Sequence, residues 1–135
     1  MYEGLIQKEE FITSLQKSNQ TYLVPVPLHK SKLRKRGYNQ AQLLSLGLSK
    51  KLNIPTIDML LRVKNTRSQV GLERKKRVEN ICGAFSLAPN ILISQYPNIF
   101  LIDDVLTTGS TLLEAANVLK RNGVKKVWGI ALARD

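Results

Sequence analysis

Two adjacent carboxylates, Asp103 and Asp104, come directly before a run of small and hydroxyl-bearing residues: Thr107, Thr108, Gly109, Ser110 and Thr111. Hydroxyls and the free backbone N–H groups of a helix start bind phosphate, and a glycine lets the phosphate approach the backbone closely. The carboxylates would repel a phosphate, but they suit the hydroxyls of a sugar or a hard cation that bridges to them. A phosphate site beside a diol site is what a ribose 5-phosphate requires.

The flanking residues predict the elements that hold this stretch. Ile99–Ile102 is a short, continuous apolar run, which is typical of a strand buried on both faces. Residues 112–123 have helical spacing, and either Ser110 or Thr111 can cap the helix start, with Thr111 and Glu114 forming a capping box. We therefore expect a strand, an acidic turn, a hydroxyl-rich loop and a helix. The alternative is an ordinary strand–turn–helix whose acidic turn is merely solvated.

Two other phosphate-binding patterns are absent from the sequence. Without GxxxxGK[ST] there is no P-loop, so the apolar run ending in two acids has no partner with which to form an ATPase metal site. Without GxGxxG, a dinucleotide-binding fold is disfavoured.

Three blocks of sequence resemble one known family. FLIDDVLTTGST, residues 100–111, resembles the PRPP-binding motif of type I phosphoribosyltransferases. VPVPLHKSKLRKRGYNQAQLL (Val24 to Leu44) and TRSQVGLERKKRVENICGAF (Thr66 to Phe85) resemble the ComF branch of that family. The blocks come in the family's order, and the similarity extends roughly from Thr21 to Arg134. The resemblance implies an α/β fold with a twisted, mainly parallel sheet and helices on both faces.

The resemblance also implies a reaction and a set of residues. A nucleophile would attack C1 of PRPP and displace pyrophosphate, with Asp103, Asp104 and Arg67 as the catalytic residues. Asp103 and Asp104 would hold the ribose hydroxyls directly or through Mg²⁺, which we expect as the cofactor. The 5-phosphate would bind at Thr107, Thr108, Gly109, Ser110 and Thr111, and pyrophosphate at the turn Leu28, His29 and Lys30. A hood over PRPP would carry Thr66, Gln69, Arg74 and Arg77 beside Arg67.

The role of His29, the only histidine, stays open: it is either a general base or a residue that shapes the pyrophosphate turn. The acceptor nucleophile cannot be identified from the sequence. Because strands and helices alternate around Ile99–Ile102, the sheet should be parallel, and its ligand should lie beyond the carboxyl ends of the strands.

The remaining sequence predicts further elements. Polar, basic residues dominate residues 28–36 and 64–77, which we interpret as a loop and the mobile hood. Asn39 and Gln42 predict a cap for a helix that extends to Leu52, whose buried side would be Leu43, Leu44, Leu46 and Leu48. An amphipathic helix over residues 4–17 is also expected, with strands at 21–26, 59–63, 83–87 and 126–133.

Length and composition favour a single globular domain over residues 1–135, with 43% hydrophobic and 23% charged residues. No apolar run is long enough for a membrane span, and no signal peptide is visible. The single cysteine, Cys82, cannot form an internal disulfide, which favours a reducing cytoplasm. One histidine and one cysteine cannot form the N-terminal zinc site of ComF-like proteins, so the chain is either a truncated form or the catalytic part alone.

The charge is concentrated in one part of the chain. The net charge is +11, and fourteen Lys or Arg residues lie between Lys30 and Arg77 against two acids. Such a stretch predicts anionic partners: PRPP and pyrophosphate, or single-stranded DNA bound by outward-facing Lys32, Arg34 and Lys35. A DNA-binding or scaffold module beside a competence helicase, and a PRPP-sensing regulator, are the alternative functions. A homodimer is left open.

Overall fold

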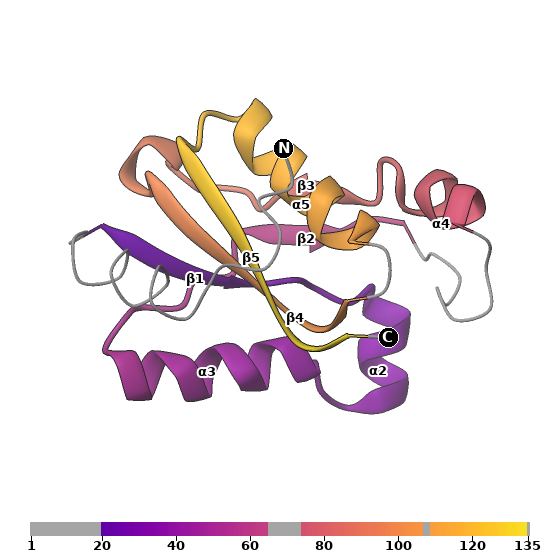
Figure 1. Ribbon diagram of the computed structural model, residues 1–135, viewed down its shortest axis with the longest axis horizontal. Helices are drawn as coiled ribbons and strands as arrows, with labels where there is room; N and C mark the ends of the chain where they lie inside the picture. Colours follow the sequence, from indigo (N-terminus) through magenta and orange to yellow (C-terminus); the bar gives the residue numbers. More distant parts are fainter. Residues whose placement is uncertain (1–19, 65–73, 107–108, 135) are drawn as a thin grey trace.

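The structure is a computed structural model that describes residues 20–64, 74–106 and 109–134 (Figure 1). The helix expected over residues 4–17 lies outside the described residues. In chain order the elements are β1 (Thr21–Pro25), α2 (Lys30–Arg36), α3 (Gln40–Leu52), β2 (Leu60–Arg62), α4 (Arg74–Ile81), β3 (Phe85–Leu87), the 3₁₀ turn η1 (Ile93–Gln95), β4 (Asn98–Leu106), α5 (Ser110–Arg121) and β5 (Lys126–Arg134). Over the described part of the chain, every helix falls short of the length and apolar character that crossing a membrane requires.

A parallel sheet with the strand order β1-β4-β5 forms the centre of the molecule. On the far side of β1, the Leu23 N–H donates to the Pro55 carbonyl at 2.9 Å and the Ile57 N–H donates to the Leu23 carbonyl at 2.9 Å. The expected strands at 59–63 and 83–87 appear as β2 and β3, which form a separate antiparallel pair. The structure therefore has the expected mainly parallel α/β architecture.

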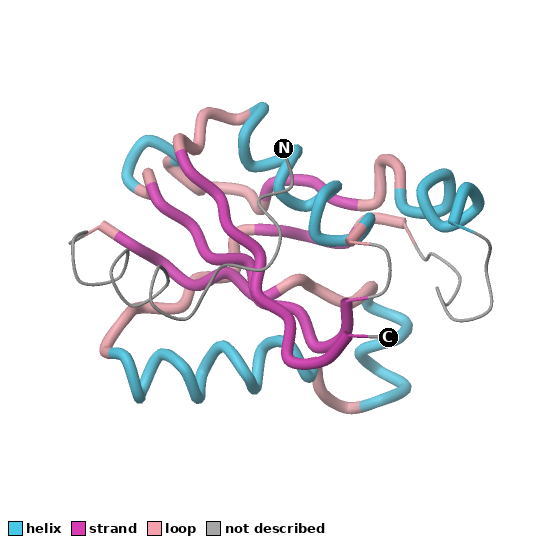
Figure 2. The backbone as a smooth tube through the Cα atoms, viewed as in Figure 1, coloured by secondary structure: helices cyan, strands magenta, loops and turns pink. Residues whose placement is uncertain are grey.

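Alternation along β4 directs its apolar side chains to both faces of the sheet. Ile99 and Leu101 pack in one core cluster with residues of α5, β2 and β3. Phe100 and Ile102 pack in a second cluster with Leu23 and with the half-buried leucines of α3. Figure 2 shows α3 and α5 on opposite sides of the strands. β4 is buried on both faces because it is the middle strand and a helix covers each side.

Helix α3 is capped as expected, but its buried side differs from the prediction. Asn39 Oδ1 accepts from the Ala41 N–H at 3.1 Å, and its amide donates to the Val26 carbonyl at 3.1 Å. Leu43 and Leu46 are 52% and 46% exposed. The face that meets the sheet instead carries Ala41, Leu44, Ser45, Leu48 and Leu52. The prediction assigned leucines to the buried side because they are apolar. The residues that are buried instead follow the three- and four-residue spacing of a helix face that starts at Ala41.

The expected loop over residues 28–36 is wrong for most of its length, because Lys30–Arg36 forms α2. Lysine and arginine are good helix formers, and the cations of the last turn interact favourably with the helix dipole. Gly37 ends the helix in the left-handed region, at φ 82°, and its N–H donates to the Leu33 carbonyl at 2.8 Å.

Candidate functional site

Asp103 and Asp104 lie inside β4, whereas the sequence predicted a turn after Ile102. β4 continues to Leu106 because β5 provides a parallel partner along this length, with Asp103 opposite Ala131. One oxygen of the Asp103 carboxylate accepts from the Asp104 N–H at 2.9 Å. Asp103 and Asp104 are adjacent in the strand, and their side chains lie close enough to share a hydrogen bond.

The surroundings of Asp103 disfavour its charged form. Burial, followed by a hydrogen bond with the Asp104 side chain, raises the pKa of Asp103 to about 7. The negative charge of Asp104 acts in the same direction, while the Asp104 N–H and the Arg62 guanidinium oppose the shift. A carboxyl with these neighbours suits a position where a cation or a sugar hydroxyl completes its environment.

Arg62 is a site residue that the sequence reasoning missed. It is half-buried at the end of β2, and its guanidinium carbon lies 5.2 Å from the centre of the Phe85 ring. Burial lowers the pKa of Arg62, and Asp103 partly offsets that effect. Residues 59–63 were interpreted only as an apolar strand. The available signal was strand alternation, which puts Arg62 on the same inward face as the buried Leu60.

Lys32 reaches the same region from α2. It is half-buried, and its pKa is lowered by burial first and then by the positive charges of Arg62 and Arg36. The expectation that Lys32 faces outward is therefore wrong, whereas Arg34 and Lys35 are exposed. Because cations that repel one another are stabilised by a bound anion, Lys32 and Arg62 form a candidate anion site beside Asp103.

The described part of the phosphate loop begins at Gly109, since Thr107 and Thr108 lie outside the described residues. Gly109 precedes α5 with φ 82°, a conformation that favours glycine. Ser110 is buried and Thr111 half-buried, and both belong to the first turn of α5, which contains no acidic residue. The N–H groups of such a turn have no partner within the helix. The prediction that Ser110 or Thr111 caps the helix is wrong, because Gly109 is the N-cap residue.

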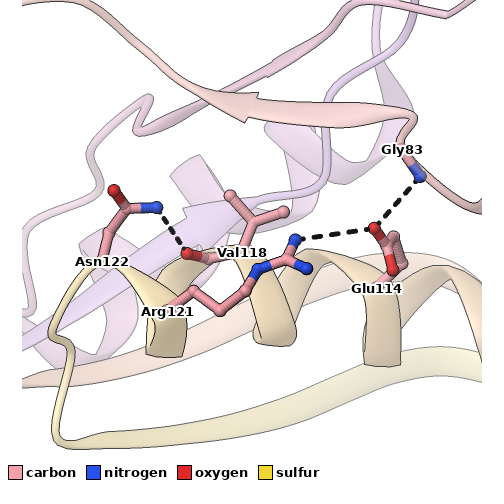
Figure 3. A network of polar contacts seen from close by, with 5 residues as sticks. All are labelled: Gly83, Glu114, Val118, Arg121 and Asn122. Atoms are coloured by element: carbon pink, nitrogen blue, oxygen red, sulfur yellow. Dashed lines mark hydrogen bonds and ion pairs between the residues drawn. The ribbon is translucent and has the colours of Figure 1, made fainter.

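The expected capping box between Thr111 and Glu114 is also wrong, because Glu114 interacts elsewhere (Figure 3). Its carboxylate accepts from the Gly83 N–H at 3.2 Å and lies 3.9 Å from an Arg121 guanidinium nitrogen. Near the end of the same helix, the Asn122 side chain donates to the Val118 carbonyl at 2.7 Å. Glu114 thus connects α5 to the turn that follows α4.

The predicted hood is described only at its end. Thr66, Arg67 and Gln69 lie outside the described residues. Arg74 and Arg77 belong to α4, and only their backbone is described. The structure therefore does not place any hood side chain at the site.

The predicted pyrophosphate turn of Leu28, His29 and Lys30 follows β1 at the same end of the sheet as the two acids. The Val26 N–H donates to the Ile102 carbonyl at 2.9 Å, directly before the acidic pair. His29 is the N-cap residue of α2, where Nδ1 accepts from the Ser31 N–H at 3.2 Å and lies 3.0 Å from the Ser31 hydroxyl. These contacts show that His29 caps α2 and shapes the turn, while its role as a general base stays a prediction.

The acids present are compatible with Mg²⁺. The described residues contain no group of three or more His, Cys, Asp or Glu side chains that could hold a metal by themselves. Mg²⁺ commonly binds proteins through one or two carboxylates together with substrate phosphates and water. Asp103 and Asp104 match that donor set, and a cation would relieve the repulsion between their charges.

Comparison with known proteins identifies the chain's relatives. Residues 37–135 match the phosphoribosyl transferase domain. Competence protein F of Haemophilus influenzae is 46% identical over 114 residues, which cover 82% of this chain and 50% of that protein. DNA utilization protein YhgH of Escherichia coli is 36% identical over 113 residues, which cover 83% of this chain and 48% of that protein.

A third relative, competence protein ComFC of Bacillus subtilis, is 36% identical over 101 residues, or 75% of this chain and 39% of that protein. The chain spans about half the length, or less, of these curated relatives. The domain match and the identity to competence protein F confirm the resemblance inferred from the three sequence blocks. The chain belongs to the phosphoribosyl transferase domain family and, within it, to the ComF group.

Proposed function

We propose that this chain binds PRPP together with Mg²⁺ and transfers the phosphoribosyl group to a nucleophile, with release of pyrophosphate, in the service of DNA uptake. The observation that supports this most directly is the end of β4. Asp103 lies close enough to Arg62 to interact electrostatically with it, Arg62 interacts in the same way with Lys32, and α5 begins at Ser110, soon after β4 ends at Leu106. A carboxylate pair with cations near it and a helix start shortly after it in the chain offers the groups that a sugar with phosphates at both ends would need.

In this proposal each group has a defined task. The first-turn N–H groups of α5, with Ser110 and Thr111, hold the 5-phosphate, while Asp103 and Asp104 orient the ribose through its hydroxyls. Lys32 and Arg62 face the pyrophosphate, which leaves with the electrons of its bond to C1 as the nucleophile forms a new bond there. Mg²⁺, when bound, supplies further charge neutralisation on the leaving group.

A second candidate function is a module that binds single-stranded DNA without turnover. Arg34 and Lys35 are exposed on α2, and a relative carries the name DNA utilization protein. A regulator that binds PRPP without consuming it is the third candidate. These functions differ in their measurable products, because only a transferase releases pyrophosphate when an acceptor is present.

The site is tested by replacing Asp104 with Asn and measuring PRPP binding by isothermal titration with and without Mg²⁺. Losing one charged contact should weaken Mg²⁺-dependent binding roughly tenfold or more, while the fold persists because the two side chains have the same shape. Asp58→Asn is the matched control, since Asp58 is an exposed acid outside the site, and it should bind like the wild type. Unchanged affinity in Asp104→Asn would refute the site. A pyrophosphate-release assay then separates a transferase from a regulator.

A further inference from the structure

A pocket lies away from the proposed PRPP site. Its volume is about 250 Å³, and it is lined by Lys120, Lys125, Lys126, Val127 and Trp128. These residues come from the end of α5, the turn after it and the beginning of β5. The proposed PRPP site lies at the opposite, carboxyl end of the parallel strands, so the pocket is separate from it.

The aromatic side of the pocket is held firmly by the core. The Trp128 ring stacks on Phe100, with ring centres 4.8 Å apart and planes inclined by 16°. Phe100 is fully buried, and Trp128 is half-buried, so part of the indole remains accessible and lines the pocket. β5 is the outer strand of the described sheet, which leaves its free edge beside the pocket. An apolar surface is therefore presented in a fixed orientation.

The lining of the pocket is also strongly basic. Lys120, Lys125 and Lys126 are all exposed, and the sequence from Ala115 to Arg134 contains no acidic residue. A favourable interaction with the helix dipole explains the positive charge of Lys120 in the last turn of α5. The same interaction does not explain the charges of Lys125 and Lys126, which follow the helix. A ligand for this pocket should therefore combine negative charge with a flat apolar group.

We infer that this pocket binds a nucleotide unit of single-stranded DNA, with the base against Trp128 and Val127 and the flanking phosphates at the three lysines. Aromatic rings beside a positively charged track are the usual means of binding single strands without sequence preference. Inorganic phosphate would gain nothing from the indole, and an uncharged ring would gain nothing from the lysines. DNA is the chosen polymer because a relative is named for DNA utilization. The site is independent of PRPP binding.

The test uses the fluorescence of Trp128, which is the only tryptophan in the chain. Titration with an oligothymidylate of about 12 nucleotides should quench the emission to saturation, with affinity falling as salt increases. Replacing Lys120, Lys125 and Lys126 with Ala should reduce the slope of log K against log salt by roughly two units and weaken binding tenfold or more. The control replaces the exposed Lys50 and Lys51 on α3, which removes positive charge elsewhere and should leave the slope nearly unchanged.

Three results would overturn the inference. One is an equal loss of binding in the control variant, and another is oligonucleotide binding, seen by anisotropy, that leaves the Trp128 emission unchanged. The third is equally strong quenching by a polyglutamate peptide of matched charge, which would indicate a general anion surface.

The double variant Arg34→Ala with Lys35→Ala measures how much of the oligonucleotide binding belongs to the competing surface on α2. PRPP titration of the triple Ala variant should match the wild type, so failure of PRPP binding in both would count against the proposed function alone.

Discussion

Asp103 makes the folded protein less stable when it is charged, and it also has a proposed role in binding. Burial and the adjacent Asp104 raise its pKa to about 7, while Arg62 counteracts the shift. A charged Asp103 is therefore unfavourable in the ligand-free protein. Groups with such shifts are concentrated at functional sites, where a ligand or a cation supplies the missing stabilisation.

The pH dependence of stability follows from this shift. The folded chain binds the Asp103 proton more tightly than the unfolded chain, whose Asp pKa is 3.8, so the carboxylate makes stability fall as the pH rises from about 4 to about 7. Asp103→Asn keeps the acceptor for the Asp104 N–H and removes the charge. In EDTA we expect the free energy of unfolding of the variant to exceed that of the wild type by about 2 kcal/mol at pH 8, a value that allows for the partial solvent exposure of Asp103. Near pH 4 the two free energies should be equal.

Urea denaturation at three pH values measures this difference, with Asp58→Asn as a control that should follow the wild type. A stability difference between Asp103→Asn and the wild type that stays constant with pH would contradict the assignment.

At the scale of the elements, α2 and α3 are neighbours in the chain but are stabilised in different ways. α2 is a short basic helix without buried residues, and it depends on the His29 cap at its start and Gly37 at its end. α3 covers one face of the sheet, and Ser45 fixes it further by sharing a hydrogen bond of 2.6 Å with Thr56. The position of Lys32 at the site thus depends on two local caps.

The glycines of these helices should respond oppositely to the same substitution. A Cβ at Gly37 or Gly47 would meet no atom within 4 Å, so space does not distinguish them. Gly37 has φ 82°, where alanine is strained, and Gly37→Ala should destabilise the protein by about 1 kcal/mol. Gly47 lies inside α3, and Gly47→Ala should stabilise it by roughly 0.5–1 kcal/mol. Chemical denaturation measures both, and changes of the same sign would contradict this account.

At the scale of the whole molecule, β4 joins the two core clusters and carries the acidic pair at its end. Its central position means that disturbing the core also disturbs the site. Leu101 is fully buried in the cluster beneath α5, whereas Leu113 on α5 itself is 39% exposed.

These two leucines form a matched pair that tests how much β4 contributes to the stability of the protein. Leu101→Ala should reduce the free energy of unfolding by about 3 kcal/mol, because it removes packed atoms and leaves a cavity. Leu113→Ala should change it by less than about 1 kcal/mol. Thermal and urea unfolding would measure both, and similar losses in the two variants would show that β4 is not the centre of the core.

The sequence by itself determined the local features of this protein. The apolar run of β4, the acids after it, the presence of a helix after them and the Asn39 cap could be predicted because each depends on residues close together in the chain. The same stretches carried the family resemblance, and with it the fold class.

Only the tertiary structure decided where β4 ends, because its last residues are held by β5. The same holds for the meeting of Lys32, Arg62 and Asp103, which come from three separate elements. Glu114 was assigned to a cap within α5, but Gly83 from another turn offers it a hydrogen bond instead. The pocket beside Trp128 likewise combines the end of a helix with a strand edge. Such contacts depend on how elements pack across long sequence separations, and no local pattern of residues encodes that packing.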